Sequence, residues 1–370
     1  MIIMTLDHVR DLLHTTSISQ SPTDLTTTSP ALFFTRWITH LCAPTFVFLS
    51  GTSAYLSMKK AGDLAATRRF LLSRGASLIL IDLTLVNFGV WFDLHFAVFF
   101  FDVLSAIGCG FIILALLIRL PARTIAAVGL AILFLHNFVQ LIPASSSPLQ
   151  TALGFLFAPG SFPIADRQVL VGYPPVPWLG VILVGFAAGK FFEREQAERK
   201  RIFMRLGLAA VGLFILLRTI NIYGDTFRWS AQKNGLYTVL SFINVTKYPP
   251  SLDFCLLFLG IMFLLLSAMQ GVKSRWTEAV SVYGKVPLFY FIVHWYIIHP
   301  LVLLMVVLQG FRGSDMVFGF NFGRPKTGSG LPLWAIYLVW IGIVVALYPV
   351  CKWYGRYKES HREKKWLRYL

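Results

Sequence analysis

Five polar residues near the start of the chain have the types and spacing of a chemical site. Asp7, Arg10, Asp11 and His14 recur at intervals of three and four residues, which places them on one face of a helix. Pairing of Arg10 with a neighbouring carboxylate explains part of this pattern structurally and leaves His14 beside a carboxylate. An imidazole titrates near neutral pH, as proton transfer requires. His14, Asp7 and Asp11 are therefore candidate catalytic residues, and His8 and Arg10 are candidate substrate-binding residues.

A second polar pair lies in the next apolar segment. Arg36 and His40 are four residues apart and share a helical face. Pro44 follows His40 by four residues, so it cannot donate a hydrogen bond to the His40 carbonyl. We expect a kink there that opens space around the imidazole; a Pro kink with a satisfied polar pair is the structural alternative. His40 is thus a second candidate catalytic residue, and Arg36 a candidate substrate-binding residue.

Two further histidines lie in an apolar segment near the end of the chain. His294 and His299, the latter beside Pro300, are five residues apart and so about 140° apart around a helix. They are not expected to contact one ligand, and a single helix histidine is most often a hydrogen-bonded packing element. Asp93 and His95 lie in a short turn that could reach the same region. All four residues are candidate substrate-binding residues.

The sequence lacks the motifs that are typical of several classes of enzyme and metal site. No H-x-x-x-H pair of metal ligands occurs, and the four cysteines are scattered: Cys42, Cys109, Cys255 and Cys351. Neither a G-x-x-x-x-G-K-[ST] phosphate loop nor a usable dinucleotide fingerprint is present. The G-x-S-x-G motif of serine hydrolases is also missing. The sequence therefore predicts no metal cofactor, and it disfavours ATP hydrolysis and serine hydrolase chemistry.

The composition indicates that lipid surrounds most of the chain. Of 370 residues, 56% are hydrophobic and only 14% are charged, compared with roughly 25% charged residues in soluble domains. A helix needs about 20 apolar residues to cross a bilayer. The predicted fold is an all-α polytopic bundle of about ten transmembrane helices. Its candidate spans are 1–14, 31–58, 66–91, 97–118, 122–143, 176–192, 203–222, 250–270, 286–309 and 332–351.

The first of these segments is short. A helix over residues 1–14 is about 21 Å long, less than the hydrocarbon thickness. We expect that it starts within the membrane, shielded by its neighbours, or that the protein has more sequence upstream.

The distribution of basic residues predicts the orientation. The even-numbered connections and the C-terminal tail carry 22 of the 33 Lys and Arg residues, and the opposite connections carry 7. Basic loops stay in the cytoplasm, so the C-terminus is predicted to be cytoplasmic, in the inner (plasma) membrane. The predicted domains are a membrane domain, 1–351, and a basic cytoplasmic tail, 352–370. The net charge of +16 reflects this asymmetry and attraction to membrane lipid; it does not indicate a nucleic-acid partner.

Nine short motifs together resemble one family. The sequence is similar to bacterial membrane proteins related to the catalytic domain of heparan-α-glucosaminide N-acetyltransferase. The matching segments are 7–11 (DHVRD), 29–40 (SPALFFTRWITH), 43–51 (APTFVFLSG), 74–75 (RG), 83–88 (LTLVNF), 106–108 (AIG), 177–180 (PWLG), 247–252 (KYPPSL) and 284–290 (GKVPLFY) with His294. The similarity thus extends over nearly the whole chain.

The resemblance implies a transmembrane acyltransferase. Such enzymes transfer an acetyl group from cytosolic acetyl-CoA to an acceptor across the membrane, typically a glucosamine amine, and a histidine in or near the first outer connection acts in catalysis. The Asp-Arg-Gly part of the family's first helix is absent here and the outer loop differs, so His14 and His40 both remain candidates. Arg74 and Trp178 are the candidate acetyl-CoA contacts. Related proteins form dimers, which implies a possible homodimer.

Two other functional classes remain open. A proton-coupled secondary transporter would also use Asp, His and Arg at membrane depth, although the sequence shows no convincing internal duplication of the kind common in transporters. A non-catalytic membrane scaffold is the third class. Acetyl-CoA binding by the purified protein would favour the acyltransferase, with a small-molecule or glycan acceptor as its partner.

Overall fold

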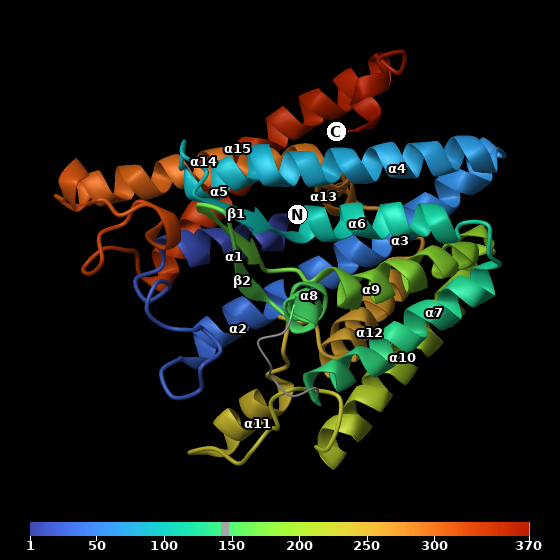
Figure 1. Cartoon of the computed structure of the whole chain (residues 1–370), viewed down its shortest axis with the longest axis horizontal. Coiled ribbons are helices and arrows are strands. Elements are labelled where there is room, and N and C mark those ends of the chain that lie inside the picture. Colours follow the sequence, from blue (N-terminus) through green and yellow to red (C-terminus); the bar gives the residue numbers. More distant parts are fainter. Residues whose placement is uncertain (142–147, 370) are drawn as a thin grey trace. The chain divides into compact units, whose positions relative to one another are not determined.

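The computed structural model describes residues 1–141 and 148–369 and is mostly helical (Figure 1). The chain forms two compact units. Unit 1 comprises Met1–Cys42, Thr84–Val98 and Val272–Leu370, and unit 2 comprises Ala43–Leu83 and Phe99–Gly271. Unit 1 contains α1 (Ile2–Leu13), α2 (Pro30–Thr39), α5 (Asn87–Trp91), α13 (Arg275–Lys285), α14 (Pro287–Leu308) and α15 (Leu333–Ser360).

Unit 2 contains the other helices. These are α3 (Cys42–Ala61), α4 (Leu64–Ile81), α6 (Val103–Leu117), α7 (Ala122–Leu135), α8 (Pro148–Phe157), α9 (Pro175–Ala188), α10 (Gln196–Ile220), α11 (Gly235–Ile243) and α12 (Leu252–Ala268). A π-helical segment, Asp82–Val86, joins α4 to α5.

Seven helices of the described chain are long and apolar enough to cross a membrane. They are Pro30–Ala61, Leu64–Trp91, Ala122–Val139, Pro175–Glu193, Gln196–Ile220, Pro287–Leu308 and Leu333–Ser360, and the apolar helices α6 and α12 are shorter. The prediction of a polytopic helical membrane protein is confirmed, whereas the count of ten spans and the orientation stay predictions. The last two residues of the predicted span 122–143 lie outside the described residues.

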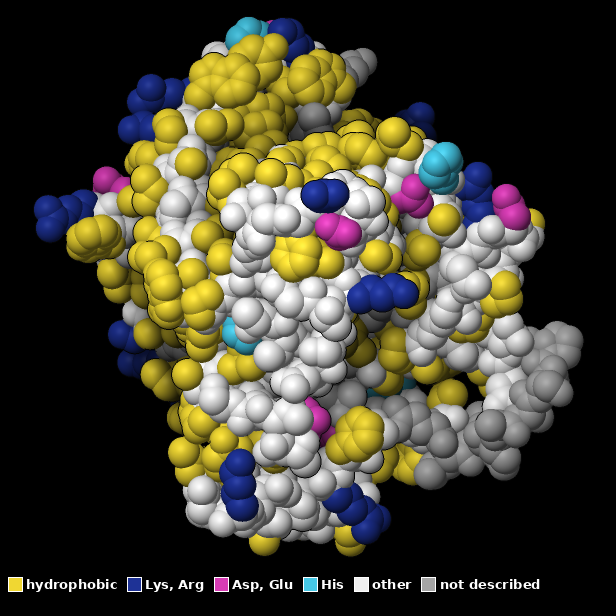
Figure 2. All heavy atoms as spheres, turned by 90° about the vertical axis from the view of Figure 1, so that its left-hand side faces the viewer, with side chains coloured by type: hydrophobic (Ala, Val, Ile, Leu, Met, Phe, Trp, Pro, Cys, Tyr) yellow, Lys and Arg dark blue, Asp and Glu magenta, His cyan; other side chains and the backbone are white. Residues whose placement is uncertain are grey.

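The surface agrees with a lipid environment. Hydrophobic side chains spread over much of the face in Figure 2, with few acidic side chains among them. Leu80 of α4 is 65% exposed, Leu216 of α10 is 55% exposed, and Leu338 of α15 is 61% exposed. Helices that expose leucines to this extent are stable where the solvent is lipid.

The prediction of an all-α chain is wrong in one region. A three-stranded sheet contains β1 (Val98–Phe101), β2 (Gly160–Ile164) and β3 (Arg167–Val171) in the order β1-β3-β2. The strands β2 and β3 pair antiparallel, with Gly160 opposite Val171. We had assigned the apolar residues of β1 to the span 97–118, because a run of four hydrophobic residues does not distinguish a strand from the start of a helix.

Close helix contacts in unit 2 depend on glycine. A Cβ atom added to Gly75 of α4 would lie 2.6 Å from the carbonyl oxygen of Gly108 in α6, and the reverse substitution gives the same distance. No side chain fits at that separation. The two helices therefore pack backbone against backbone, as small residues permit in membranes.

Buried charges in unit 2 hold helix ends. One carboxylate oxygen of Asp82 accepts hydrogen bonds from the backbone N–H groups of Asp102 (3.0 Å) and Ser105 (2.9 Å), at the N-terminus of α6. The Arg218 guanidinium lies 3.8 Å from the Asp253 carboxylate. These membrane-depth charges therefore have structural partners.

The short helix α1 is largely enclosed by α2, α14 and α15. Eight of its twelve residues are buried. The Trp340 indole of α15 donates to the Ile2 carbonyl at 2.8 Å, and the hydroxyl groups of Thr5 and Tyr290 are 2.6 Å apart. This burial agrees with a helix that its neighbours shield, and α1 carries the largest group of predicted site residues.

Candidate functional site

The carboxylates of α1 form an ion-pair cluster with two arginines. Arg10 donates to Asp7 at 2.8 Å and to Asp11 at 2.5 Å. Arg36 of α2 reaches Asp7 at 2.5 Å and lies 3.9 Å from Asp11. The predicted stripe therefore exists, and Arg10 pairs with both carboxylates rather than with one of them. The pairing of two cations with two anions offsets the cost of burying them.

Local sequence explains the position of Arg36. The helix α2 begins at Pro30, and the hydroxyl of Ser29 accepts a hydrogen bond from the Leu32 backbone N–H at 3.3 Å. Ser as N-cap with Pro as the next residue is a favoured helix start. Arg36 then lies on the second turn of α2, where its guanidinium bonds Asp7. Asp7 therefore binds two guanidinium groups, those of Arg10 and Arg36.

A second polar contact in unit 1 joins two histidines. The Nδ1 atom of His8 lies 2.6 Å from the Nε2 atom of His294 in α14. His294 is fully buried, whereas His8 is partly exposed. The Nδ1 atom of His294 contacts the Tyr290 carbonyl oxygen at 3.2 Å. The three groups form a chain from a backbone carbonyl to a partly exposed imidazole.

Hydrogen-bond chemistry fixes the protons of this chain. A carbonyl oxygen only accepts hydrogen bonds, so Nδ1 of His294 carries a proton and its Nε2 is an acceptor in the neutral ring. The Nδ1 atom of His8 must then donate, which places the lone pair of neutral His8 on Nε2. When His8 takes up a proton at Nε2, its Nδ1–H bond to His294 stabilises the charge. His8 therefore has the arrangement of a general base oriented by a second histidine.

Aromatic rings hold His8 in place. Its imidazole stacks on Trp295, with ring centroids 4.1 Å apart and 18° between the planes, and meets Phe291 edge to face at 6.3 Å. A stacked aromatic ring favours an imidazolium above it. Packing thus restricts the orientation of the His8 ring.

His14 follows the last residue of α1 and does not join the carboxylates. Among the described residues it makes no hydrogen bond to Asp7 or Asp11; its Nδ1 atom instead lies 3.3 Å from the Thr16 backbone nitrogen and 3.1 Å from the Thr16 hydroxyl. Since a backbone N–H only donates, Nδ1 is the acceptor and the proton of neutral His14 lies on Nε2. Burial, and then the charges of Arg10 and Arg324, lower the pKa of His14. In this geometry His14 is a neutral N–H donor, which disagrees with the expected orientation by a carboxylate.

A buried arginine from a distant loop holds the end of α1. Arg324, only 1% exposed, donates to the carbonyls of Leu12 (3.1 Å) and His14 (3.0 Å) and to the Ser17 hydroxyl (2.9 Å). It also bonds the hydroxyl and the carbonyl of Ser329. Arg324 thus satisfies the Leu12 carbonyl, which the helix end leaves without a partner, and adds a third hydrogen bond to the His14 carbonyl, which also accepts from the backbone N–H and the hydroxyl of Ser17.

The same loop runs beside His14 because of a glycine. Thr15 and Leu331 share a backbone hydrogen bond of 3.2 Å, and the Leu331 N–H donates to the Leu13 carbonyl at 2.7 Å. Gly330 has a φ of +130°, and a Cβ atom there would lie 2.6 Å from the Thr15 Cα atom. Only glycine permits this approach. Arg324 is one of the seven basic residues of the connections predicted to lie opposite the cytoplasm, and nothing in the local sequence pattern indicates its burial.

The other predicted residues of unit 1 lie at separate positions. His40 is the C-cap of α2 and only 4% exposed. The helix is interrupted there, since α2 ends at Thr39 and α3 begins at Cys42, but the imidazole is buried rather than in the open space that we expected. His299 is buried and stacks on Phe92, with centroids 4.3 Å apart, away from the pair formed by His294.

The remaining candidates have local or core positions. The Asp93 carboxylate accepts hydrogen bonds from the backbone N–H groups of His95 and Ala97, both at 2.9 Å, and so shapes a turn. The His95 residue is exposed. In unit 2, Trp178 is fully buried, and Arg74 is partly exposed. The predicted roles of Asp93 and His95 in acceptor binding, and of Arg74 and Trp178 in acetyl-CoA binding, stay predictions.

Comparison with known proteins identifies the family. The family model described as heparan-alpha-glucosaminide N-acetyltransferase, catalytic, matches residues 1–223, a span that includes α1 and α2. The motifs at 247–252 and 284–290, and His294, lie outside the matched span. A comparison with curated proteins found no match. The match covers more than half of the chain, and the chain therefore belongs to the heparan-alpha-glucosaminide N-acetyltransferase catalytic-domain family.

Proposed function

We propose that this chain is a membrane acetyltransferase that uses acetyl-CoA as donor. The acceptor is an amine or hydroxyl of an amino sugar or glycan on the opposite side of the membrane. Membership of an N-acetyltransferase family supports the reaction class. The observation that carries the proposal within the molecule is the 2.6 Å contact between His8 and His294, because acetyl transfer to an amine needs a group that removes a proton.

His8 is the proposed general base. The acceptor nitrogen or oxygen attacks the carbonyl carbon of the thioester, and its proton passes to Nε2 of His8. The C–S bond to CoA then breaks, and the proton returns from His8 to the CoA thiolate. Donation from His8 Nδ1–H to His294 stabilises the imidazolium in between. No net proton is gained or lost by the protein.

The outer end of α1 is the proposed acceptor site. His14 lies six residues beyond His8, or about 9 Å along the helix, so the two imidazoles cannot act on the same atom directly. The Nε2–H of His14 would donate to an acceptor oxygen or nitrogen. Asp11, whose side chain is 44% exposed, and Arg36 would bind the polar groups of the acceptor. His40, the C-cap of α2, remains a candidate.

The direct test is acetyl transfer by the purified protein. With labelled acetyl-CoA and glucosamine, we expect transfer of the label by the wild type, and loss of transfer in His8→Ala with no loss of folding. His361→Ala, in the C-terminal region, is the matched control and should remain active. Wild-type protein without affinity for CoA, or an active His8→Ala variant, would contradict the proposal.

The orientation belongs to the same proposal. We propose about ten membrane spans, a cytoplasmic C-terminus and a position in the inner membrane. Acetyl-CoA would then approach from the cytoplasmic side, where the basic connections would bind the CoA phosphates. A homodimer remains a prediction from the resemblance.

A proton-coupled transporter is the second candidate function. The His8–His294 pair favours it, since linked imidazoles also conduct protons. Uptake of a solute into proteoliposomes that depends on a pH gradient and is unaffected by acetyl-CoA would favour this candidate over the acetyltransferase.

A further inference from the structure

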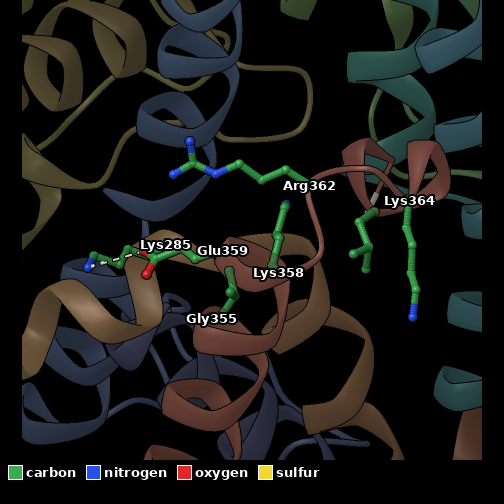
Figure 3. A pocket seen from close by; sticks show the side chains of 8 residues that line it. Lys285, Gly355, Lys358, Glu359, Arg362 and Lys364 are labelled. Carbon is green, nitrogen blue, oxygen red and sulfur yellow. Dashed lines mark ion pairs between the residues drawn. The ribbon is translucent and has the colours of Figure 1, made fainter.

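A basic pocket lies in unit 1 at the ends of two membrane helices. Its volume is about 420 Å³, and it is lined by Lys285 at the end of α13, by Lys358 and Glu359 of α15, and by Arg362 and Lys364 beyond α15. Figure 3 shows that the Arg362 side chain extends toward the side of the Lys285–Glu359 pair. The Lys358 side chain points toward that of Arg362. Lys364 lies on the other side of the intervening turn.

The charges of this pocket are not balanced. Glu359 is the only acidic side chain among its lining residues, and it lies 3.8 Å from the Lys285 ammonium. The Lys364 ammonium donates to the Tyr357 hydroxyl at 2.7 Å, and it makes no ion pair with a carboxylate of the described residues. Within the described residues Arg362 makes no hydrogen bond or ion pair. Among the described lining residues, Arg362 and Lys364 therefore form a positive field that an anion would neutralise.

The position of the pocket indicates which class of anion it could bind. Lys285 lies two residues before the start of α14, and Arg362 lies two residues after the end of α15. Both helices are long and apolar enough to cross the membrane, so the pocket lies near the level of the lipid headgroups. Basic pockets at that level bind phosphate-bearing groups. Val286 and Leu367 add apolar lining that suits the organic part of such a ligand.

We propose that this pocket binds a phosphate group, with the Arg362 guanidinium as its main ligand. A guanidinium matches two phosphate oxygens at once, whereas the lysines act as point charges. Two molecules present this chemistry here: an anionic phospholipid and the phosphate-rich nucleotide of CoA. The second source rests on the proposed acetyltransferase function, and the first does not.

Binding measurements on the full-length protein distinguish the sources. One arm measures the affinity of 3′,5′-ADP, the nucleotide part of CoA, by calorimetry. The other measures phosphatidylglycerol retained by the protein in native mass spectrometry, with phosphatidylcholine as the neutral comparison. We expect Arg362→Gln to weaken one of these ligands about tenfold and Lys358→Gln to weaken the same ligand. Arg356→Gln is the control, because Arg356 is exposed on α15 and does not line the pocket.

Each outcome decides the proposal. Weaker 3′,5′-ADP binding in Arg362→Gln identifies the nucleotide, and weaker phosphatidylglycerol retention identifies the lipid. Equal losses of ligand affinity in Arg362→Gln and Arg356→Gln would show a general effect of charge and would contradict a specific binding site in the pocket. No loss in either arm would also overturn it. The variant His8→Ala should bind both probes as the wild type does, which separates failure of the pocket from failure of the catalytic proposal.

Discussion

Buried polar groups in the two units are used differently. In unit 2, the Arg218 guanidinium donates to the carbonyls of Phe227 (2.8 Å), Phe242 (2.9 Å), Asn244 (2.9 Å) and Ser241 (3.2 Å). In unit 1, the buried groups of α1 bond other side chains: Arg10 bonds carboxylates, and His8 bonds His294.

This difference distinguishes buried polar residues with a structural role from those that can take part in a reaction. A guanidinium whose donors are filled by backbone carbonyls joins segments of the chain and has no capacity left for a ligand. An imidazole pair with one shared proton keeps a lone pair that can accept another. Arg324 is of the first kind although it lies beside His14, so proximity to a candidate site does not by itself give a residue a chemical role.

The largest expected effect is on stability, in Arg218→Ala. The change leaves buried carbonyls and the Asp253 carboxylate without their partner, at a cost of about 3–5 kcal/mol. We expect a large fall in the thermal unfolding temperature in detergent. Arg228→Ala, an exposed arginine of the same unit, should unfold as the wild type does. Equal unfolding temperatures of Arg218→Ala and Arg228→Ala would contradict a structural role of the buried Arg218.

Replacement of Arg324 by Ala should have a smaller effect. The variant leaves the Leu12 carbonyl without its Arg324 partner and removes one of the three hydrogen bonds to the His14 carbonyl, which costs about 1–3 kcal/mol. Because the end of α1 loses its clamp, limited proteolysis should cut between residues 15 and 29 faster than in the wild type. The exposed Lys326 of the same loop provides the control, Lys326→Ala, and similar cleavage of both variants would argue against a clamp.

Substitution of His294 tests the histidine pair without removing the proposed base. His294→Phe removes the acceptor of the His8 proton, and we expect kcat to fall about a hundredfold. His294→Gln keeps a side-chain oxygen that can accept this hydrogen bond and should restore part of the activity. If the two variants have the same kcat, His294 only fills space.

The smallest expected effect concerns the pH dependence of stability. Burial and two nearby arginines lower the pKa of His14 below its ordinary value, which is about 6.5. The unfolded chain therefore binds the proton more readily, and this contribution to stability is lost as the pH falls below about 6.5. Unfolding measured between pH 7 and pH 5 should show a shallower slope in His14→Gln. An unchanged slope would mean that His14 is not held in its neutral form.

Local spacing predicted the parts of the site that lie on one helix. Intervals of three and four residues fix neighbours on a helical face, so the pair of Arg10 with Asp7 followed directly from the sequence, whereas Asp11 is adjacent to Arg10 in the chain and its pairing does not follow from that spacing. The contact of His8 with His294 did not, because it joins positions 286 residues apart and depends on how α1 packs on α14.

Loop geometry was the second limit on prediction. The burial of Arg324 depends on the path of its loop past Gly330 and Thr15, and no periodicity indicates that path. For the same reason the sheet was missed, since its strands are four or five residues long. Membrane helices were predictable because an apolar run of sufficient length has few alternatives in lipid.

The most direct test of the account is the rate of acetyl transfer by purified His8→Ala and His14→Ala protein. We predict that His8→Ala lowers kcat by at least about a hundredfold while the protein remains folded. We predict that His14→Ala mainly raises KM for the acceptor. A His8→Ala enzyme with wild-type kcat, or a kcat loss confined to His14→Ala, would contradict the assignment of His8 as the base.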